Sequence, residues 1–172
     1  MFFDANCCIG QYYNGGCGAP DTRALLDEMD YYGINRALVR HSNLDRGAEY
    51  TNKLVTELLK EDQERRLTGV WCVLPSQCGE IPEPDRFFAQ MKESRIGALT
   101  LSPFEHRYIP CRFTLGKIMD AAAERRIPVL LNAFAGKWQE MYDFLAAFPK
   151  NVFLYQELRG KWGSDRNVRP LL

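Results

Sequence analysis

Phe2-Phe3-Asp4-Ala5-Asn6-Cys7-Cys8-Ile9-Gly10 is a short, largely apolar segment near the start of the chain, and it predicts a buried β-strand that ends at the glycine. Side chains alternate along a strand, so one face is expected to be polar and to carry Asp4, Asn6 and Cys8. The other face would be apolar and carry Phe3, Ala5 and Cys7, so Cys7 and Cys8 are expected to point to opposite faces. On an exposed sheet this is ordinary alternation, whereas in a chain that alternates strands and helices the polar face would point into a site. The sequence leaves both interpretations open.

The bulk composition narrows the class of protein. The chain has 172 residues, with 22 Lys plus Arg and 22 Asp plus Glu, and therefore a formal net charge of zero. It is long enough for one domain with a sizeable core, and no basic stripe favours nucleic acid or an anionic membrane as a partner. No apolar segment approaches a membrane span, and no signal peptide is recognisable. Six cysteines are too few for a disulfide scaffold, so thiols and a cytoplasmic location are expected.

Strands and helices alternate after the first segment. Further apolar segments predict strands at residues 36–41, 67–74, 96–102, 128–133 and 152–157. Apolar side chains at helical spacing predict helices at residues 22–33, 45–66, 112–126 and 138–148, with others beginning near Pro84 and near residue 164. Asp21 or Thr22 is the expected N-cap of the first helix, and Gly33 its end. In the helix at 138–148, the stripe expected to pack against the sheet is Trp138, Tyr142, Leu145 and Phe148.

This succession amounts to six strand–helix units, repeated about every 25 to 35 residues, which is typical of parallel α/β architecture. Two arrangements of such a sheet are possible, an open doubly wound sheet and a barrel. A doubly wound open sheet lacks support, because no Gly-rich phosphate loop follows the first strand. A TIM-barrel-like repeat fits better, but a full barrel of eight units needs about 250 residues. We therefore expect an incomplete barrel with about six of eight units, in which residues 1–172 form a single domain corresponding to the N-terminal part of a full barrel.

Several phrases of the sequence, taken in order, resemble one known family. The first strand has the frame Asp-x-His-x-His-x-Gly without its histidines, and similar phrases lie at residues 33–39, at 97–103 followed by Glu105-His106, and at 127–131. Together they resemble the amidohydrolase superfamily, in its amidohydrolase-2 branch of TIM-barrel metal-dependent hydrolases, which includes relatives of aminocarboxymuconate-semialdehyde decarboxylase. The resemblance spans essentially the whole chain. It implies a hydrolase or decarboxylase that acts on a small carboxylate or cyclic substrate through metal-activated water.

The sequence departs from this family at the positions that would bind the metal. The resemblance places Asn6, Cys8 and Asn132 where the family has histidines, with Gln156 or Glu157 near a further position on the sixth strand. A catalytic zinc needs about three His, Cys or carboxylate ligands and an open position for water, and neutral amide oxygens are poor zinc ligands. The expected cofactor is a divalent metal, zinc, if the protein is active, and the alternative is a metal-free barrel that binds a ligand or assembles.

Other candidate site residues lie where predicted strands end. His41 and Glu157 are the candidates for catalysis, and Asp4, His106, Arg107 and Arg159 are those for substrate binding. The competing interpretation is that His41 is a loop histidine with a single hydrogen bond and that Arg159 is simply solvated. A nucleophilic pair of Cys8 with His41 ranks lower, because no third orienting group is evident. All of these residues are expected at one end of the sheet.

The expected partners follow from the same considerations. They are a small-molecule substrate and a second copy of the chain, with neither nucleic acid nor membrane. Self-association is expected because an incomplete barrel leaves strand edges unpaired, and exposed edges invite pairing with another chain.

Overall fold

The structure, a computed structural model, describes residues 1–10, 18–43, 46–131 and 138–155. Six strands form one sheet in the order of the sequence, and every neighbouring pair is parallel. The strands are β1 (Phe2–Ile9), β2 (Ile34–His41), β3 (Leu67–Cys72), β4 (Ile96–Leu101), β5 (Val129–Leu131) and β6 (Phe153–Tyr155). The helices are α1 (Thr22–Tyr32), α2 (Ala48–Glu61), α3 (Pro84–Glu93), α4 (Arg112–Glu124) and α5 (Trp138–Ala147), with a 3₁₀ turn, η2, at Ser76–Cys78.

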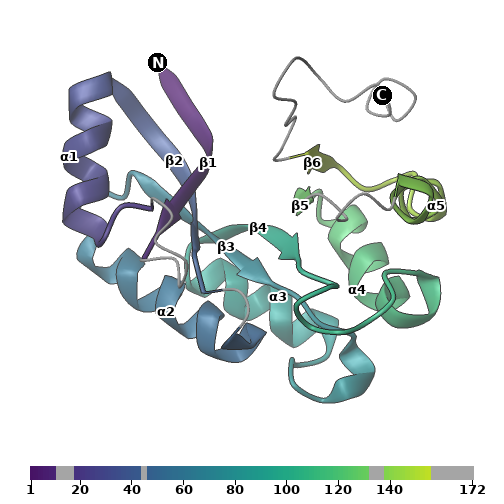
Figure 1. The fold of residues 1–172 in the computed structure, drawn as a ribbon. Coiled ribbons are helices and arrows are strands. Elements are labelled where there is room, and N and C mark those ends of the chain that lie inside the picture. Colours follow the sequence, from purple (N-terminus) through teal and green to yellow (C-terminus); the bar gives the residue numbers. More distant parts are fainter. Residues whose placement is uncertain (11–17, 44–45, 132–137, 156–172) are drawn as a thin grey trace.

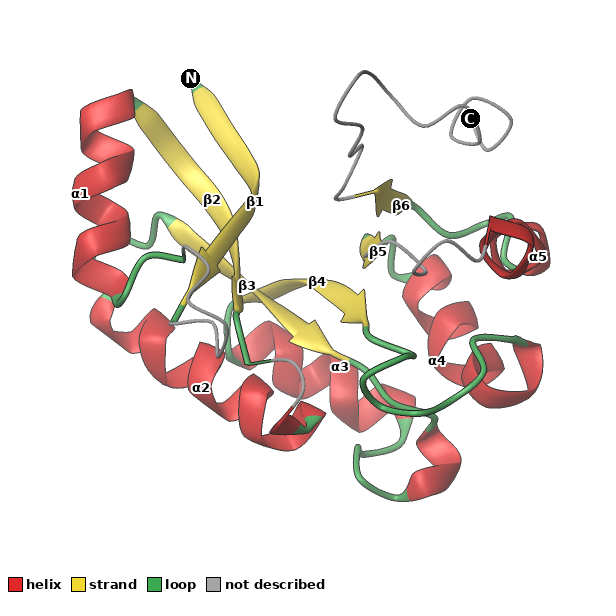
Figure 2. Cartoon of the chain, in the orientation of Figure 1, coloured by secondary structure: helices red, strands yellow, loops and turns green. Residues whose placement is uncertain are grey.

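The sheet curls into half of a barrel, with the helices along its outer side (Figure 1). Figure 2 shows the concave face of the strands turned away from the helices. Among the described residues, β1 and β6 stand at the two ends of the sheet and do not pair with each other. This confirms the prediction of an incomplete, TIM-barrel-like α/β fold and excludes the doubly wound alternative, whose helices would cover both faces.

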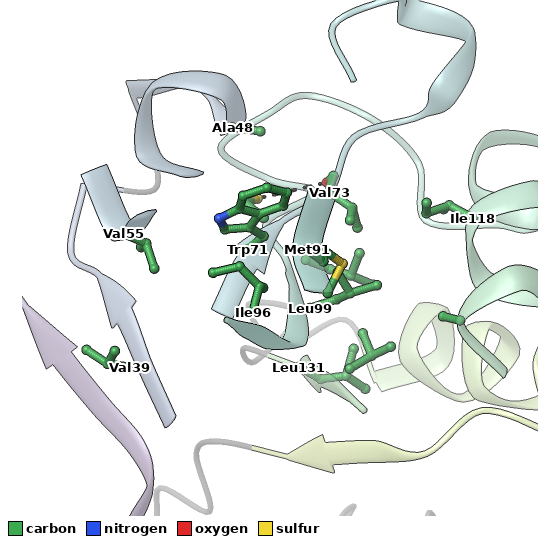
Figure 3. Packing of buried hydrophobic residues seen from close by; sticks show 14 of the residues in the cluster. Val39, Ala48, Val55, Trp71, Val73, Met91, Ile96, Leu99, Ile118 and Leu131 are labelled. Atoms are coloured by element: carbon green, nitrogen blue, oxygen red, sulfur yellow. Dashed lines mark hydrogen bonds between the residues drawn. The ribbon is translucent and has the colours of Figure 1, made fainter. Parts of the chain in front are cut away.

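Alternating side chains build two apolar layers on the two faces of the sheet. The inner layer is thin and takes one residue from each of five strands, namely Leu38, Val70, Ala98, Leu130 and the partly buried Leu154. The outer layer is larger and fills the space between the sheet and the helices. Figure 3 shows part of it, where Trp71, Ile96 and Leu99 of the sheet lie beside Met91 of α3. Most of the stabilising burial therefore lies on the helical side.

Local signals in the sequence account for several element boundaries. Asp21 caps α1 by accepting a hydrogen bond from the Ala24 N–H at 2.8 Å, and Gly33 ends it in the left-handed conformation, as predicted. Pro84 occupies the first turn of α3, also as predicted. The prediction of α2 at 45–66 is too long, because buried Asp62 ends the helix and accepts a hydrogen bond from the Leu67 N–H that starts β3. No helix in the described part of the chain is long and apolar enough to cross a membrane.

The predicted stripe of α5 is partly wrong. Tyr142 is 52% exposed, whereas Met141 and Phe144 are the buried residues of this helix. Trp138 and Leu145 are half-buried, and Phe148 is buried just beyond the helix end. Trp138, Leu145 and Phe148 pack with the core as predicted, so the error is confined to Tyr142, at the edge of the buried face of a short helix that is apolar over much of its surface. The predicted helix near residue 164 lies outside the described residues.

A buried asparagine of α2 replaces missing strand pairing at the end of β3. The pairing of β2 with β3 stops at Val39 and Gly69, whereas β3 pairs with β4 as far as Cys72. The Asn52 side chain donates to the Cys72 carbonyl at 2.9 Å and accepts from the Cys72 N–H at 2.7 Å. It thereby provides both hydrogen bonds that a neighbouring strand would otherwise supply, and it joins α2 to the C-terminal end of β3.

Replacing Asn52 with leucine should destabilise the fold strongly. The substitution would leave a buried N–H and a buried C=O of Cys72 without partners, and each such group costs about 1–3 kcal/mol. We expect Asn52→Leu to lower the free energy of unfolding by about 2–5 kcal/mol in urea titration, and Lys53→Leu, at the exposed neighbouring position, to change it by less than about 0.5 kcal/mol. Equal stabilities of the two variants would contradict the role given to Asn52.

Candidate functional site

The first part of the candidate site is formed where β1 and β2 end. Cys7 lies opposite Val39, and Cys8 lies opposite Arg40. Val39 packs in the outer layer, so alternation places Cys8 and Arg40 on the concave face. This agrees with the prediction that Cys7 and Cys8 point to opposite faces.

The C-terminal ends of β3 and β4 contribute the neighbouring part of the candidate site. Cys72 lies opposite Thr100, two residues beyond Val70 and Ala98 of the inner layer. We call the group of Cys8, Arg40, Cys72 and Thr100 the mouth. Barrel proteins place their sites at this C-terminal end of the strands, where the loops that follow each strand can contribute further groups. A surface hollow between α2 and α3 opens on the outer side and is separate from the mouth.

A bulge in β1 overturns the expected alternation of this strand. A step of three residues, from Asp4 to Cys7, faces a step of two in β2, from Ala37 to Val39. Asp4 and Cys7 consequently share the helix-facing side. The prediction that Asp4 shares a face with Cys8 is therefore wrong, because one extra residue reverses the order of the faces. The Asn6 N–H donates to the Asp4 carboxylate at 2.8 Å within this bulge.

The environment of Cys7 keeps its thiol protonated. Burial raises the pKa of Cys7 to about 12, and a Coulombic interaction and a hydrogen bond with the Asp4 carboxylate act in the same direction. A thiol with this pKa is a poor nucleophile near neutral pH. Cys7 is therefore a structural residue of the outer layer.

His41 lies at the expected end of the sheet but not on the concave face. It is paired with Ile9, one residue past Arg40, so alternation turns it toward the helical side. The residue is 8% exposed, and its Nδ1 accepts a hydrogen bond from the Asn43 N–H at 3.1 Å. Burial and the positive charge of Arg46 lower the pKa of His41. The imidazole is therefore neutral at pH 7, with its proton on Nε2 and its acceptor nitrogen already occupied.

The ring of His41 packs directly over Gly10. A Cβ atom at Gly10 would lie 2.7 Å from His41 Nε2 and 2.9 Å from Ser42 Oγ, and Gly10 has a φ of +97°. Both the space and the backbone conformation require glycine at this position. The ends of β1 and β2 are therefore held together closely, which positions the neighbouring Cys8 and Arg40 at the mouth.

His106 reaches the end of β3 from the loop that follows β4. Its Nδ1 lies 3.6 Å from Cys72 Sγ, and Tyr108 of the same loop donates from its hydroxyl to the Val73 carbonyl at 3.5 Å. Burial raises the pKa of Cys72 to about 12, so the contact joins a neutral thiol to an imidazole. Cys72 and His106 therefore do not form the thiolate–imidazolium pair of a cysteine hydrolase, and the contact anchors the loop beside the mouth.

The remaining predicted residues divide into two groups. His106 is half-buried beside the mouth, and Arg107 is exposed on the same loop. Asn132, Glu157 and Arg159 lie outside the described residues, so their predicted roles stay predictions. Sequence reasoning missed Arg40 and Cys72. The signal that could have singled out Arg40 is the alternation of side chains along the strand at 36–41. Combined with the register between this strand and β1, it places Arg40 on the same face as Cys8.

The described residues fit a catalytic metal poorly. No group of three or more His, Cys, Asp or Glu side chains within residues 1–10, 18–43, 46–131 and 138–155 is arranged to hold a metal ion. Of the three positions where the resemblance implied ligands, Asn6 offers only an amide, Asn132 lies outside the described residues and Cys8 is a single thiol at the mouth. This donor set does not match the three His, Cys or carboxylate ligands of a catalytic zinc.

Fold and site together define an α/β half-barrel with a polar mouth at the C-terminal ends of its strands. Comparison with solved structures finds a chain of the same architecture, the crystal structure of a probable 2-pyrone-4,6-dicarboxylic acid hydrolase from Acinetobacter baumannii with citric acid bound. The TM-score is 0.66 at 13% sequence identity, so the likeness concerns the fold. It covers 90% of this chain and 56% of that one, so the chain spans little more than half of its structural neighbour. No family model and no curated protein matches the sequence.

The titration of His41 should make stability depend on pH. Its pKa is lower in the folded protein than the ordinary 6.5, so the unfolded chain binds more protons between these two values. Stability should therefore fall as the pH drops below about 6.5, and this loss should end below the folded pKa. We expect the slope between about pH 7.5 and 5.5 to be shallower for His41→Gln than for the wild type in urea titrations. Superimposable slopes would show that His41 does not contribute.

Proposed function

We propose that this protein is a hydrolase-like barrel that binds a small carboxylate compound on its concave face. The observation that carries the proposal is the mouth itself. Register and alternation bring the partly buried Cys8 and Arg40 and the fully buried Cys72 and Thr100 to the same end of a sheet whose inner layer is otherwise apolar. The structural neighbour supports the substrate class, because it is a probable hydrolase of a pyrone dicarboxylic acid and was crystallised with citric acid. The resemblance to the amidohydrolase-2 branch points to the same reaction class.

Two groups of residues are assigned within this proposal. His106 contacts the substrate, because it lies beside the mouth on a loop that its own contact with Cys72 anchors. Glu157 remains the proposed group for proton transfer on the resemblance alone, since it lies outside the described residues. His41 has a supporting role instead, because its Nδ1 is occupied and its ring packs over Gly10 on the helical side. Because the donor set described above does not fit zinc, no step of the reaction is assigned to a metal.

The poor metal donor set also favours a second candidate function. A barrel that has lost metal ligands can keep its polar mouth as a ligand-binding surface without catalysis. This candidate shares the concave face and the small carboxylate ligand with the first. It differs only in the absence of turnover, so binding and hydrolysis have to be measured separately.

Hydrolysis is tested with 2-pyrone-4,6-dicarboxylate. The opening of its ring is monitored as a decrease in ultraviolet absorbance. We expect turnover above that of a heat-denatured sample. His106→Gln should raise KM by about tenfold, equivalent to one lost polar contact of about 1.4 kcal/mol, whereas exposed Lys150→Ala should leave KM unchanged. Binding of the compound without any turnover would contradict the hydrolase proposal and support the non-catalytic candidate.

The metal content gives an independent prediction. Because amide oxygens are poor zinc ligands, we expect elemental analysis after gel filtration to find well under one zinc per chain. The double variant Asn6→His with Cys8→His restores the family's donor types at the first strand. Zinc binding by this variant would show that the other ligand positions of the site can still hold a metal ion. One tightly held zinc per wild-type chain would refute the prediction and make Cys8 a ligand.

A further inference from the structure

Among the described residues, Arg40 is the basic side chain that strand alternation places on the inner face at the mouth. Arg40 is the penultimate residue of β2 and lies opposite Cys8. It follows Leu38 of the inner layer by two residues, so both side chains project from the concave face. β2 stops pairing with β3 at Val39, so Arg40 lies where these two strands separate. The guanidinium group therefore projects from the concave side at a point where β3 provides no paired neighbour.

Arg40 differs from the other partly buried arginines. Three described arginines are half-buried, namely Arg40, Arg66 and Arg95. Arg66 pairs with Asp30 at 2.6 Å, and Arg95 pairs with Asp62 at 3.3 Å. Among the described residues, Arg40 has neither a carboxylate partner nor a hydrogen bond to its buried Nε. Within the described part of the chain, Arg40 is thus the half-buried arginine without an ion pair.

An unpaired, partly buried guanidinium group requires a partner from elsewhere. Its charge loses hydration in the protein, and a nitrogen without a hydrogen bond costs free energy. Arginine remains charged at all ordinary pH values, so it cannot reduce this cost by losing a proton. The ligand that best matches its planar set of N–H donors is a carboxylate, which can accept two parallel hydrogen bonds.

We propose that Arg40 binds a carboxylate group of the ligand on the concave face and thereby selects for di- and tricarboxylates. This inference rests on the proposed function, since it deepens the assignment of that same site. A second carboxylate or the reacting carbonyl extends from Arg40 toward His106 on the loop after β4. Selectivity then comes from charge, because an uncharged analogue of the same shape leaves the Arg40 guanidinium unpaired.

The test measures the binding of citrate, glutarate and uncharged glutaramide by calorimetry and by thermal shift on the full chain. The wild type should bind the two carboxylates and not the amide. Arg40→Gln should weaken citrate binding by tenfold or more, which corresponds to the loss of about 1.4 kcal/mol or more. Arg40→Lys should recover part of the affinity, because lysine keeps the positive charge but cannot form the bidentate pair of hydrogen bonds to a carboxylate. Arg36→Gln is the matched control, because Arg36 is an exposed residue of the same strand and lies near its N-terminal end, away from the mouth.

Each outcome decides the inference. Equal citrate affinity of Arg40→Gln and the wild type overturns it, as does the absence of citrate and glutarate binding by the wild type. A loss of stability in ligand-free Arg40→Gln, but not in Arg36→Gln, also overturns it, because Arg40 then has a partner within the protein. Carboxylate binding through Arg40 without hydrolysis of any compound confirms the inference while the hydrolase proposal fails. If Arg40→Gln hydrolyses the substrate as well as the wild type does, the proposed function stands and the inference about Arg40 is wrong.

Discussion

The pair of hydrogen bonds between the Asn52 side chain and the Cys72 backbone allows β2 and β3 to separate at their C-terminal ends. Two neighbouring parallel strands normally satisfy each other's backbone groups, and separating them in the interior is costly. Here β2 leaves β3 after Val39 and Gly69, while β3 continues beside β4 to Cys72. Asn52 provides the missing partners from the helical side. The opening between β2 and β3 is therefore stable.

The bulge in β1 has a comparable effect on the other side of the mouth. One extra residue between Asp4 and Cys7 turns Asp4 to the side of Cys7, which faces the helices, and presents Cys8 to the concave face. At the end of the same strand, Gly10 allows the His41 ring to approach closely. Two local departures from regular strand geometry thus determine which side chains reach the mouth. Such irregularities are common next to sites in proteins, because they redirect single side chains without changing the sheet.

The distribution of charge separates the outer surface from the mouth. Arginines on the helical side form ion pairs, as Arg112 does with Asp120 and Arg125 with Asp85. These pairs are exposed and each contributes little to stability. Arg40 at the mouth has no such partner among the described residues, and its apolar neighbour on the strand, Leu38, cannot supply one. The same residue type therefore forms surface ion pairs in one place and, in our proposal, binds a ligand in the other.

The sequence by itself determined the repeat of strands and helices, the order of the strands, and helix boundaries such as Asp21, Gly33 and Pro84. These features depend on local periodicity and capping, which a few neighbouring residues specify. It also placed His106 beside the site and separated Cys7 from Cys8. Only the tertiary structure decided that Asp4 and His41 face the helices and that Arg40 faces the mouth. A bulge, a register and a strand separation depend on contacts between residues distant in sequence, and a shift of one residue exchanges the two faces of a strand.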